Sequence, residues 1–364
     1  MNRHHYCVIM AGGTANRFWP ISREDKPKQF FDIALSGDSF VRKTYERCKS
    51  LVPKENILVV TLSRYAALLK EQIPELPDEN LILEPYGRNT APCIAYSTYV
   101  LLKRDPEAVV LVTPSDLVVV NEDVYIRAVE DVMSHVSDNP VLMTLGLVPA
   151  SPDPNYGYIQ VRGGRNACDE GKPVKVKTFT EKPDVALAEV FCKTGEFYWN
   201  SGIFAWRASV IKEEMERYVP EITSLFAGWE GALGTPVEQE FIERAYTDCA
   251  KVSIDHGVME KSANVWMYPA KFGWMDVDSW SSLYEAYPDR DADGNVSNSG
   301  NRFFDSDRGN IILSHDSGKL MAIKGLEDFI VVDTEDVLLI CPKDDDQYRD
   351  FMARRGLPGY ENFK

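Results

Sequence analysis

Apolar and polar residues follow two different periods along the first half of the chain. Short, nearly continuous apolar runs predict buried strands at residues 6–10, 56–60, 81–83, 108–113 and 141–147. Between them, apolar residues recur at helical spacing and predict helices at residues 39–51, 64–72, 91–103 and 123–136. This alternation predicts an α/β fold with a doubly wound, mostly parallel, Rossmann-like sheet. Ligands of such sheets bind beyond the carboxyl ends of the strands.

The pattern changes after Pro149. Short strands at residues 157–161, 175–180 and 199–206 suggest a more antiparallel insertion, and helices are predicted at residues 185–193, 209–218 and 237–245. A polar segment rich in Asp, Asn and Gly, residues 287–300, is predicted to link a catalytic domain (1–286) to a C-terminal domain (301–364). There, short β runs at 310–313, 320–323, 329–333 and 337–340 predict a small all-β fold. Periodicity alone does not distinguish a β-helix from a sandwich.

Composition narrows the class of protein. The chain of 364 residues carries a net charge of −16, which disfavours a nucleic-acid surface, so an anionic substrate must be attracted by local groups. No apolar run approaches the roughly 20 residues of a membrane span. The N-terminus leads directly into the first strand, so we expect no signal peptide. Seven scattered cysteines without Cys-x-x-Cys spacing predict reduced thiols in the cytoplasm, not a zinc site or disulfides.

The first strand ends at a turn of small residues, Ala11-Gly12-Gly13. Glycines allow a sharp turn and let a ligand approach the main chain, where consecutive N–H groups bind anions. Basic residues are then concentrated in this otherwise acidic chain: Arg17, Arg23, Lys26 and Lys28. The segment therefore predicts a cradle for a polyphosphate. A tight turn without a ligand is the alternative, because the segment is neither a P-loop nor a dinucleotide fingerprint.

Two further motifs follow predicted strands. Residues 84–92, EPYGRNTAP, precede a helix that Asn89 or Thr90 could cap, and an Asn amide can also match a purine edge. Asp116 follows the most apolar strand, where it could cap a turn or hold Mg²⁺ beside phosphates. Five histidines form no visible Ser-His-Asp set, so the sequence gives no support to covalent hydrolase chemistry.

Residues 8–30, VIMAGGTANRFWPISREDKPKQF, resemble the signature loop of sugar-nucleotide pyrophosphorylases. The Phe-Trp-Pro and Pro-Lys-Gln-Phe strings are similar to those of the mannose-1-phosphate guanylyltransferase family, which usually has glycine where this chain has Ala15. Six motifs in the family's order extend the resemblance to about Tyr284. It implies Mg²⁺-dependent transfer from GTP to mannose 1-phosphate, giving GDP-mannose and diphosphate. It also implies a short left-handed β-helix at the C-terminal end. From the length of 364 residues we expect no extra isomerase domain of the kind that bifunctional relatives carry.

The resemblance also implies roles for individual residues. Arg17 would neutralise the leaving diphosphate and Lys28 the transferred phosphoryl group, while Asp116 and Asp276 would hold Mg²⁺. Nucleotide-binding residues would be Ala11, Gly12, Gly13, Glu84, Asn89, Thr90 and Ala91. Sugar-phosphate-binding residues would be Tyr156, Gly157, Glu181, Lys182, Asn200, Ser201, Gly202 and Asp255. The family often has glycine at the position of Asp278.

Two alternatives stay open at this point. The chain could use another sugar 1-phosphate or nucleotide, because few hydrogen bonds define the sugar. It could also be a non-catalytic, sugar-nucleotide-binding regulatory subunit, although a sensor has no need to retain Arg17, Lys28, Asp116 and Asp276 together. We expect small-molecule substrates and no nucleic-acid or membrane partner. The sequence leaves a homodimer open.

Overall fold

The computed structural model describes residues 2–13, 17–32, 35, 37–169, 171–287 and 289–354, with Ala167 described by its backbone alone. Ala15, where the family usually has glycine, lies outside the described residues, as does the end of the predicted C-terminal domain. The chain forms two compact units. The first comprises Met1–Gly12, Thr44–Ser115 and Val119–Trp274, and the second comprises Gly13–Lys43, Asp116–Val118 and Met275–Lys364.

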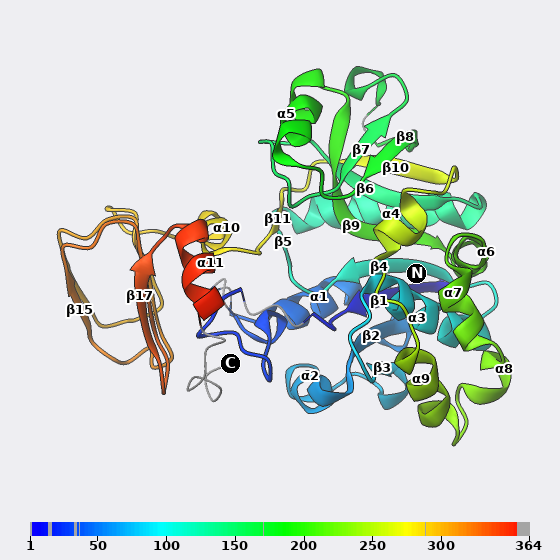
Figure 1. Ribbon diagram of the computed structural model, residues 1–364, viewed down its shortest axis with the longest axis horizontal. Coiled ribbons are helices and arrows are strands. Elements are labelled where there is room, and N and C mark those ends of the chain that lie inside the picture. The colour runs from blue at the N-terminus through cyan, green and yellow to red at the C-terminus, as the bar shows by residue number, and fades with distance from the viewer. Residues whose placement is uncertain are drawn as a thin grey trace. The chain divides into compact units, whose positions relative to one another are not determined.

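A nine-stranded sheet organises the first unit (Figure 1), in the order β3-β2-β1-β4-β9-β6-β10-β8-β7. Its strands are β1 (His5–Met10), β2 (Ile57–Leu62), β3 (Leu81–Glu84), β4 (Val109–Pro114), β6 (Leu142–Leu147), β7 (Tyr158–Val161), β8 (Val174–Thr180), β9 (Phe197–Arg207) and β10 (Val265–Ala270). Strands β1 to β4 are parallel, with Val8 opposite both Leu58 and Val112. Strands β6 and β10 are also parallel, whereas β9 runs antiparallel to β4 and β6.

Burial explains why the central strands are so apolar. Val8, Leu58 and Val112 are at most 1% exposed, because helices cover both faces of a parallel sheet. Strands β7 and β8 pair antiparallel at the other end of the sheet, as the changed pattern after Pro149 predicts. The carboxyl ends of β1, β3 and β4 are followed by the glycine turn, residues 84–92 and Asp116, respectively.

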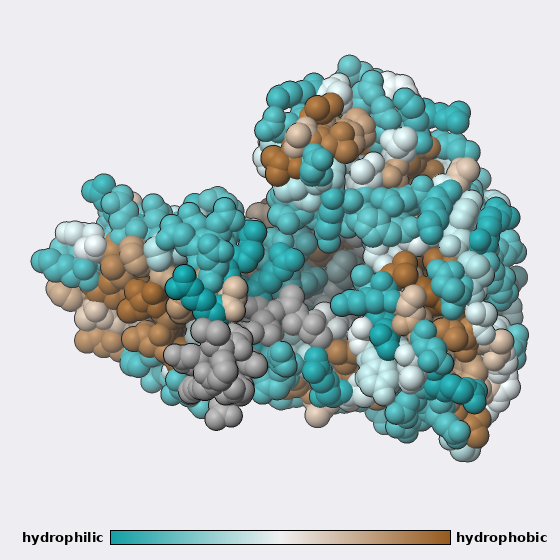
Figure 2. All heavy atoms as spheres, in the orientation of Figure 1, coloured by the Kyte–Doolittle hydropathy of each residue, from teal (hydrophilic) through white to brown (hydrophobic). Residues whose placement is uncertain are grey.

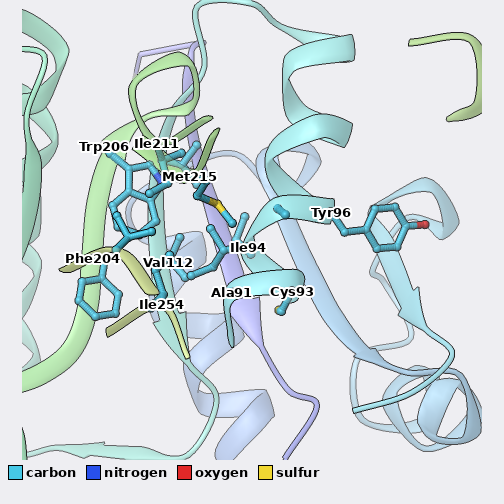
Figure 3. Packing of buried hydrophobic residues seen from close by; sticks show 14 of the residues in the cluster. Ala91, Cys93, Ile94, Tyr96, Val112, Phe204, Trp206, Ile211, Met215 and Ile254 are labelled. Carbon is cyan, nitrogen blue, oxygen red and sulfur yellow. The ribbon is translucent and has the colours of Figure 1, made fainter. Parts of the chain in front are cut away.

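The first unit also contains helices, several of which contact this sheet. They are α2 (Ala66–Gln72), α3 (Thr90–Arg104), α4 (Glu122–Asp138), α5 (Val185–Thr194), α6 (Ala208–Tyr218), α7 (Pro220–Thr223), α8 (Trp229–Ala232) and α9 (Glu238–Thr247), with a π-helical turn at Asp255–Met259. Helix α3 contacts β1 and β2, and α4 contacts β4, β6, β9 and β10. Figure 3 shows Ile94 of α3 and Met215 of α6 packed with Val112 and Trp206 in the core.

The boundary between the two units falls within three elements. These are α1 (Phe40–Lys49), β5 (Leu117–Val119) and β11 (Trp274–Asp276). The chain also passes between the units at Gly12 and Gly13, inside the glycine turn. The second unit therefore contains most of the segment after that turn. Its 3₁₀ turn Lys28–Phe30 follows Pro27 and is fully buried.

Short strands build the C-terminal part of the second unit. They are β12 (Val296–Ser297), β13 (Arg302–Asp305), β14 (Ile311–Ser314), β15 (Met321–Lys324), β16 (Phe329–Asp333) and β17 (Leu338–Pro342), flanked by α10 (Trp280–Ala286) and α11 (Asp345–Ala353). One sheet has the order β12-β14-β16-β17 and another pairs β13 with β15. These pairings are parallel except that β17 runs antiparallel to β16. Stacked asparagines link successive turns, since the buried Asn310 side chain donates to Asn295 Oδ1 at 2.9 Å. This parallel stacking is typical of a β-helix, not a sandwich.

The second unit has its own core, shared by segments far apart in the sequence. Phe18 packs edge-to-face on Trp280, with ring centroids 5.2 Å apart. Tyr348 of α11 lies in the same cluster and donates its hydroxyl to the Trp19 carbonyl at 2.9 Å. The segment that carries Arg17 is thus anchored in the core of the C-terminal strands. The predicted domain bounds 1–286, 287–300 and 301–364 stay a prediction, and packing groups residues 13–43 and 275–286 with those strands.

Apolar side chains also reach the surface of the second unit. The exposed ones include Phe303, Leu320, Leu338 and Ile340. Figure 2 shows brown surface over the part of the chain that Figure 1 labels β15 and β17. None of the helices in the part of the chain that the structure describes has the length and apolar character required to cross a membrane.

Candidate functional site

A buried lysine lies at the centre of a charge cluster in the second unit. Lys28 is 5% exposed, and its Nζ atom lies 2.9 Å from Asp116 Oδ2 and 3.7 Å from Asp276 Oδ1. The same ammonium donates a hydrogen bond to the Val277 carbonyl at 2.7 Å. The structure therefore brings together the predicted catalytic lysine and both predicted metal ligands, although these residues are far apart in the sequence.

Burial and charge oppose each other within this cluster. Burial alone would lower the pKa of Lys28, but the charges of Asp116 and Asp276 outweigh it and raise this pKa. Burial raises the pKa of Asp276 to about 6; Lys28 opposes this shift, whereas the negative charge of Asp116 adds to it. The cluster thus holds an ammonium group that stays charged at neutral pH. The carboxylates of Asp116 and Asp276 beside it repel each other, and a second cation would weaken that repulsion.

Arg17, the other predicted catalytic cation of the second unit, is more exposed than Lys28. Its Nη1 atom lies 2.5 Å from Asp278 Oδ2, and half of the Arg17 side chain remains exposed. Among the residues that the structure describes, no group of three or more His, Cys, Asp or Glu side chains could hold a metal ion.

The glycine turn is held by hydrogen bonds within each unit. In the first unit, Thr61 donates its hydroxyl to the Ala11 carbonyl at 2.9 Å, and a Cβ atom added to Gly12 would lie 3.0 Å from Glu84 Oε2. In the second unit, the Gln29 amide donates to the Gly13 carbonyl at 2.9 Å. Position 12 therefore leaves little room for any residue other than glycine.

Residues 84–91 form a tightly held loop between β3 and α3. Asn89 has a φ of 70°, and its side chain accepts a hydrogen bond from the Thr90 N–H as the N-cap of α3. The Thr90 hydroxyl oxygen accepts from the Ile254 N–H at 2.8 Å, and the Ala91 N–H donates to the Val252 carbonyl at 3.0 Å. The capping role that the sequence allowed for Asn89 is present. This cap uses the Oδ1 atom of the Asn89 side chain and not its NH₂ group.

Glu84 differs from the other predicted nucleotide-binding residues because it is a buried carboxyl group, 4% exposed. Its Oε1 atom accepts a 2.9 Å hydrogen bond from the hydroxyl of Tyr246. Burial raises the pKa of Glu84 to about 8, against the opposing effect of that hydrogen bond. At neutral pH the side chain is mostly the neutral acid, and it lies beneath the turn at Gly12.

The predicted sugar-binding residues form a polar network in the first unit. Asn200 of β9 donates to Asp255 Oδ1 at 3.0 Å and accepts from the Thr144 hydroxyl at 3.0 Å. Its main-chain N–H donates to the Gly157 carbonyl at 2.8 Å. Gly202 has a φ of 72°, and its N–H also donates to the Asn200 side chain. These contacts fix the Asn200 amide, with its oxygen turned to Thr144 and its nitrogen to Asp255.

A carboxylate oxygen without a partner lies beside this network. Glu181 Oε2 is buried and makes no hydrogen bond to any residue that the structure describes. A Cβ atom added to Gly157 would lie 2.4 Å from it, so glycine leaves the space that this carboxylate needs. Burial, and next the charge of Asp255, raise the pKa of Glu181 to about 7. The Lys182 ammonium, 3.6 Å from the other oxygen, is mostly exposed.

Aromatic rings border the same region. Tyr156 lies between Trp199 and Trp274, with ring centroids 4.9 Å and 5.0 Å away, respectively. Ser201 is buried, and its hydroxyl oxygen accepts from the Ile203 N–H. The structure thus brings most of the predicted sugar-binding residues into direct contact with one another in one unit.

Sequence reasoning missed four residues that hold these groups in place. Gln29 donates to the glycine turn and Thr144 donates to Asn200. Tyr246 donates to Glu84, and Arg88, which itself lies in the loop at residues 84–91, donates to the Tyr246 carbonyl. Arg88 stands inside the EPYGRNTAP string and could have been named. Thr144 and Tyr246 lie in ordinary strand and helix patterns, and no sequence signal marks them.

The sequence of this chain is similar to those of known nucleotidyl transferases. Residues 6–292 match the nucleotidyl transferase family, and residues 304–348 match the MannoseP isomerase/GMP-like beta-helix domain. Mannose-1-phosphate guanylyltransferase of Escherichia coli (strain K12) is 36% identical over 346 residues, covering 93% of this chain and 70% of that protein. The enzyme of the same name from Klebsiella pneumoniae is 35% identical over 350 residues, covering 93% and 71%.

Solved structures agree with the sequence matches. The crystal structure of mannose-1-phosphate geranyltransferase from Thermus thermophilus superimposes with a TM-score of 0.83 at 28% identity, covering 97% of this chain and 100% of that one. That of mannose-6-phosphate isomerase from Helicobacter pylori gives a TM-score of 0.61 at 26% identity, covering 75% and 100%. The predicted fold class, a Rossmann-like α/β domain followed by a small β-helix-like domain, is confirmed.

Proposed function

Because the chain belongs to the nucleotidyl transferase family, we propose that it is a mannose-1-phosphate guanylyltransferase that converts GTP and α-mannose 1-phosphate to GDP-mannose and diphosphate. The observation that carries this proposal is the ammonium of Lys28, buried against the carboxylates of Asp116 and Asp276. A desolvated, fixed cation of this kind is suited to a reaction in which negative charge collects on a phosphoryl group.

The proposed reaction is a single displacement. An oxygen of the sugar phosphate attacks the α-phosphorus of GTP, and the bond from that phosphorus to the oxygen bridging to the β-phosphate breaks, so diphosphate leaves with the bonding electrons. Lys28 stabilises charge on the transferred group, and Arg17 stabilises the diphosphate. No covalent enzyme intermediate is needed, because positioning and charge neutralisation supply most of the catalysis in such transfers.

The donor set of the second unit fits a divalent cation. Asp276 has a raised pKa partly because Asp116 repels it, and that repulsion is what a bound cation removes. Asp116 and Asp276 would hold Mg²⁺, which takes one or two carboxylates and completes its shell with phosphate oxygens and water. When bound, Mg²⁺ would draw negative charge from the α-phosphate.

We assign the nucleotide to the glycine turn and to residues 84–91, and the sugar to the network around Asn200 in the first unit. The unpartnered Glu181 Oε2 can accept a hydrogen bond from a sugar hydroxyl without losing an existing contact. Tyr156 supplies an aromatic wall, and the exposed Lys182 ammonium would meet the sugar phosphate. A left-handed turn of the β-helix, a cytoplasmic location and a homodimer belong to the same proposal.

A panel of nucleoside triphosphates (GTP, ATP, UTP and dTTP) against mannose 1-phosphate and glucose 1-phosphate, with Mg²⁺, tests the proposal by diphosphate release. We expect GTP with mannose 1-phosphate to give the highest kcat/KM, because a site built around specific hydrogen bonds rejects analogues that lack the partner group. Equal turnover of dTTP with glucose 1-phosphate would assign a different substrate pair. Binding of GDP-mannose without turnover of any pair would indicate a regulatory subunit.

A further inference from the structure

The C-terminal end of α9 and the segment that follows it grip the loop of residues 84–91 at both ends. At the first end, Glu84 at the close of β3 is buried and accepts the hydrogen bond from the hydroxyl of Tyr246. The other carboxyl oxygen, Oε2, is the atom that a Cβ on Gly12 would approach to 3.0 Å. Tyr246 therefore fixes a side chain on which the glycine turn itself rests.

Arg88 makes a second connection between the loop and α9. Its Nε atom donates to the Tyr246 carbonyl and its Nη2 atom to the Thr247 carbonyl, both at 2.9 Å. The last carbonyls of a helix have no partner within the helix, and a cation there also complements the helix dipole. Arg88 thus satisfies the end of α9, and in return α9 fixes Arg88 in the middle of the loop.

The far end of the loop is bound by the same stretch of chain. Thr90 and Ala91 pair with Ile254 and Val252 through the two hydrogen bonds described above. Residues 246–254 therefore contact the loop at its beginning, its middle and its end. Between Arg88 and Thr90 stands Asn89, which has the strained φ of 70° that the surrounding contacts must maintain.

We propose that Tyr246 and Arg88 are positioning residues for nucleotide choice: by holding the loop 84–91 on the end of α9, they fix Asn89 and the turn at Gly12 in the arrangement that selects the base. This inference rests on the assignment of the loop to the nucleotide under the proposed function. Neither residue needs to touch the nucleotide. Loss of Tyr246 or Arg88 should weaken the binding of the correct base. A polar group of the loop that has shifted away from the base discriminates poorly between bases.

Two variants and a matched control test this inference. Tyr246→Phe removes one hydroxyl from a buried ring, and Arg88→Met removes the donors from a partly exposed side chain that does not belong to the core. Tyr96→Phe is the control, since Tyr96 donates a 2.8 Å hydrogen bond to Glu238 of the same helix α9. The substitution keeps the Tyr96 ring, which packs edge-to-face with the Tyr246 ring, and it breaks none of the hydrogen bonds that hold the loop.

Steady-state rates with GTP and with ATP give the decisive measurement. We expect both variants to raise KM for GTP about tenfold with kcat within about twofold of wild type, on the scale of one lost hydrogen bond. The GTP-to-ATP ratio of kcat/KM should fall by a similar factor. Tyr96→Phe should leave this ratio unchanged. If both variants keep the wild-type ratio and the wild-type KM, the inference is wrong.

Amide hydrogen exchange of the free protein separates this inference from the proposed function. Faster exchange in residues 84–91 of both variants, with unchanged exchange in β4, supports the grip of α9 on the loop whichever nucleotide the enzyme uses. A wild-type enzyme that prefers UTP overturns the proposed substrate, and the variants must then weaken the preference for UTP. Unchanged exchange in the loop of both variants overturns the inference, even where GTP is the substrate.

Discussion

The ammonium nitrogen of Lys28 lies 2.9 Å from the carboxylate of Asp116, and both side chains belong to the same compact unit although they come from distant parts of the sequence. Lys28 is nearly fully buried, so this ion pair is little screened by water or salt. Burial of a lone ammonium would be costly, and the two carboxylates offset that cost. The pair therefore places a permanent positive charge at a fixed point.

Replacing Lys28 with alanine should lower kcat by about a hundredfold or more, the scale of losing one preorganised charge-stabilising group. KM for GTP should change less, because the main-chain donors of the glycine turn remain. Steady-state kinetics of Lys28→Ala check this, with Lys324→Ala as the control, since that change removes an exposed ammonium that pairs with Asp305 of β13. A large loss of GTP affinity with an intact kcat would make Lys28 a ground-state anchor.

Replacing either Asp116 or Asp276 with asparagine should abolish Mg²⁺-dependent turnover and leave the fold intact. The amide removes the charge that a cation needs, while its size is unchanged. A Mg²⁺ titration of activity, together with thermal unfolding, measures both effects, and Asp336→Asn, which breaks the ion pair with Arg23, serves as a control. Contrary evidence would be a complex with GTP and Mg²⁺ whose two carboxylates lie more than about 6 Å apart, too far to share a cation at Mg–O distances near 2.1 Å.

Removing the carboxylate of Asp278 should strengthen the interaction with GTP. Asp278 pairs with Arg17, the residue proposed to meet the diphosphate, and a partly exposed pair of this kind is worth at most about 1 kcal/mol. Asp278→Asn and Asp278→Gly should therefore lower KM for GTP by about two- to fivefold at low salt. Initial rates at low and high salt measure this change. A rise in KM would mean that Asp278 orients Arg17 productively.

The stability of the protein should fall as pH rises from about 5 to 8 because of Glu84. Its folded pKa, about 8, lies above the ordinary value of 4.5, so the folded state disfavours the ionised form. There is no penalty below the unfolded pKa, and the full penalty, on the order of a few kcal/mol, is present above the folded pKa. Glu84→Gln, which mimics the neutral acid, should flatten this dependence in denaturant unfolding at several pH values. An equally steep decline in Glu84→Gln would assign the effect to other groups.

Most of the central sheet could be predicted because burial leaves a direct mark on sequence. Strand β4 is buried along almost its whole length, so its positions are nearly all apolar and the run is visible. Strand β10 was missed, because Pro269 interrupts a short mixed run of aromatic and aliphatic residues that reads weakly as a strand. Helix α11 was missed as well, since its first turn is a run of aspartates and its apolar face is narrow.

The candidate site could be predicted only in part. The spacing of Lys28, Asp116 and Asp276 gives no hint that they meet, and only the resemblance to a family joined them. The buried state of Glu84 and its bond to Tyr246 depend on how α9 packs beside β3, which no local pattern encodes. No local pattern predicts that Glu181 Oε2 lacks a hydrogen-bond partner either, because this depends on which residues the fold places around it.

The packing of Phe18 and Trp19 into the core of the C-terminal strands restricts how this protein can be recombined. A chain cut near residue 300 would keep the segment with Arg17 and Lys28 but lose Tyr348, which binds the main chain at Trp19. The β-helix is thus not a cassette that can be exchanged between relatives on its own. A functional chimaera would have to inherit residues 13–43 and 275–354 from the same parent.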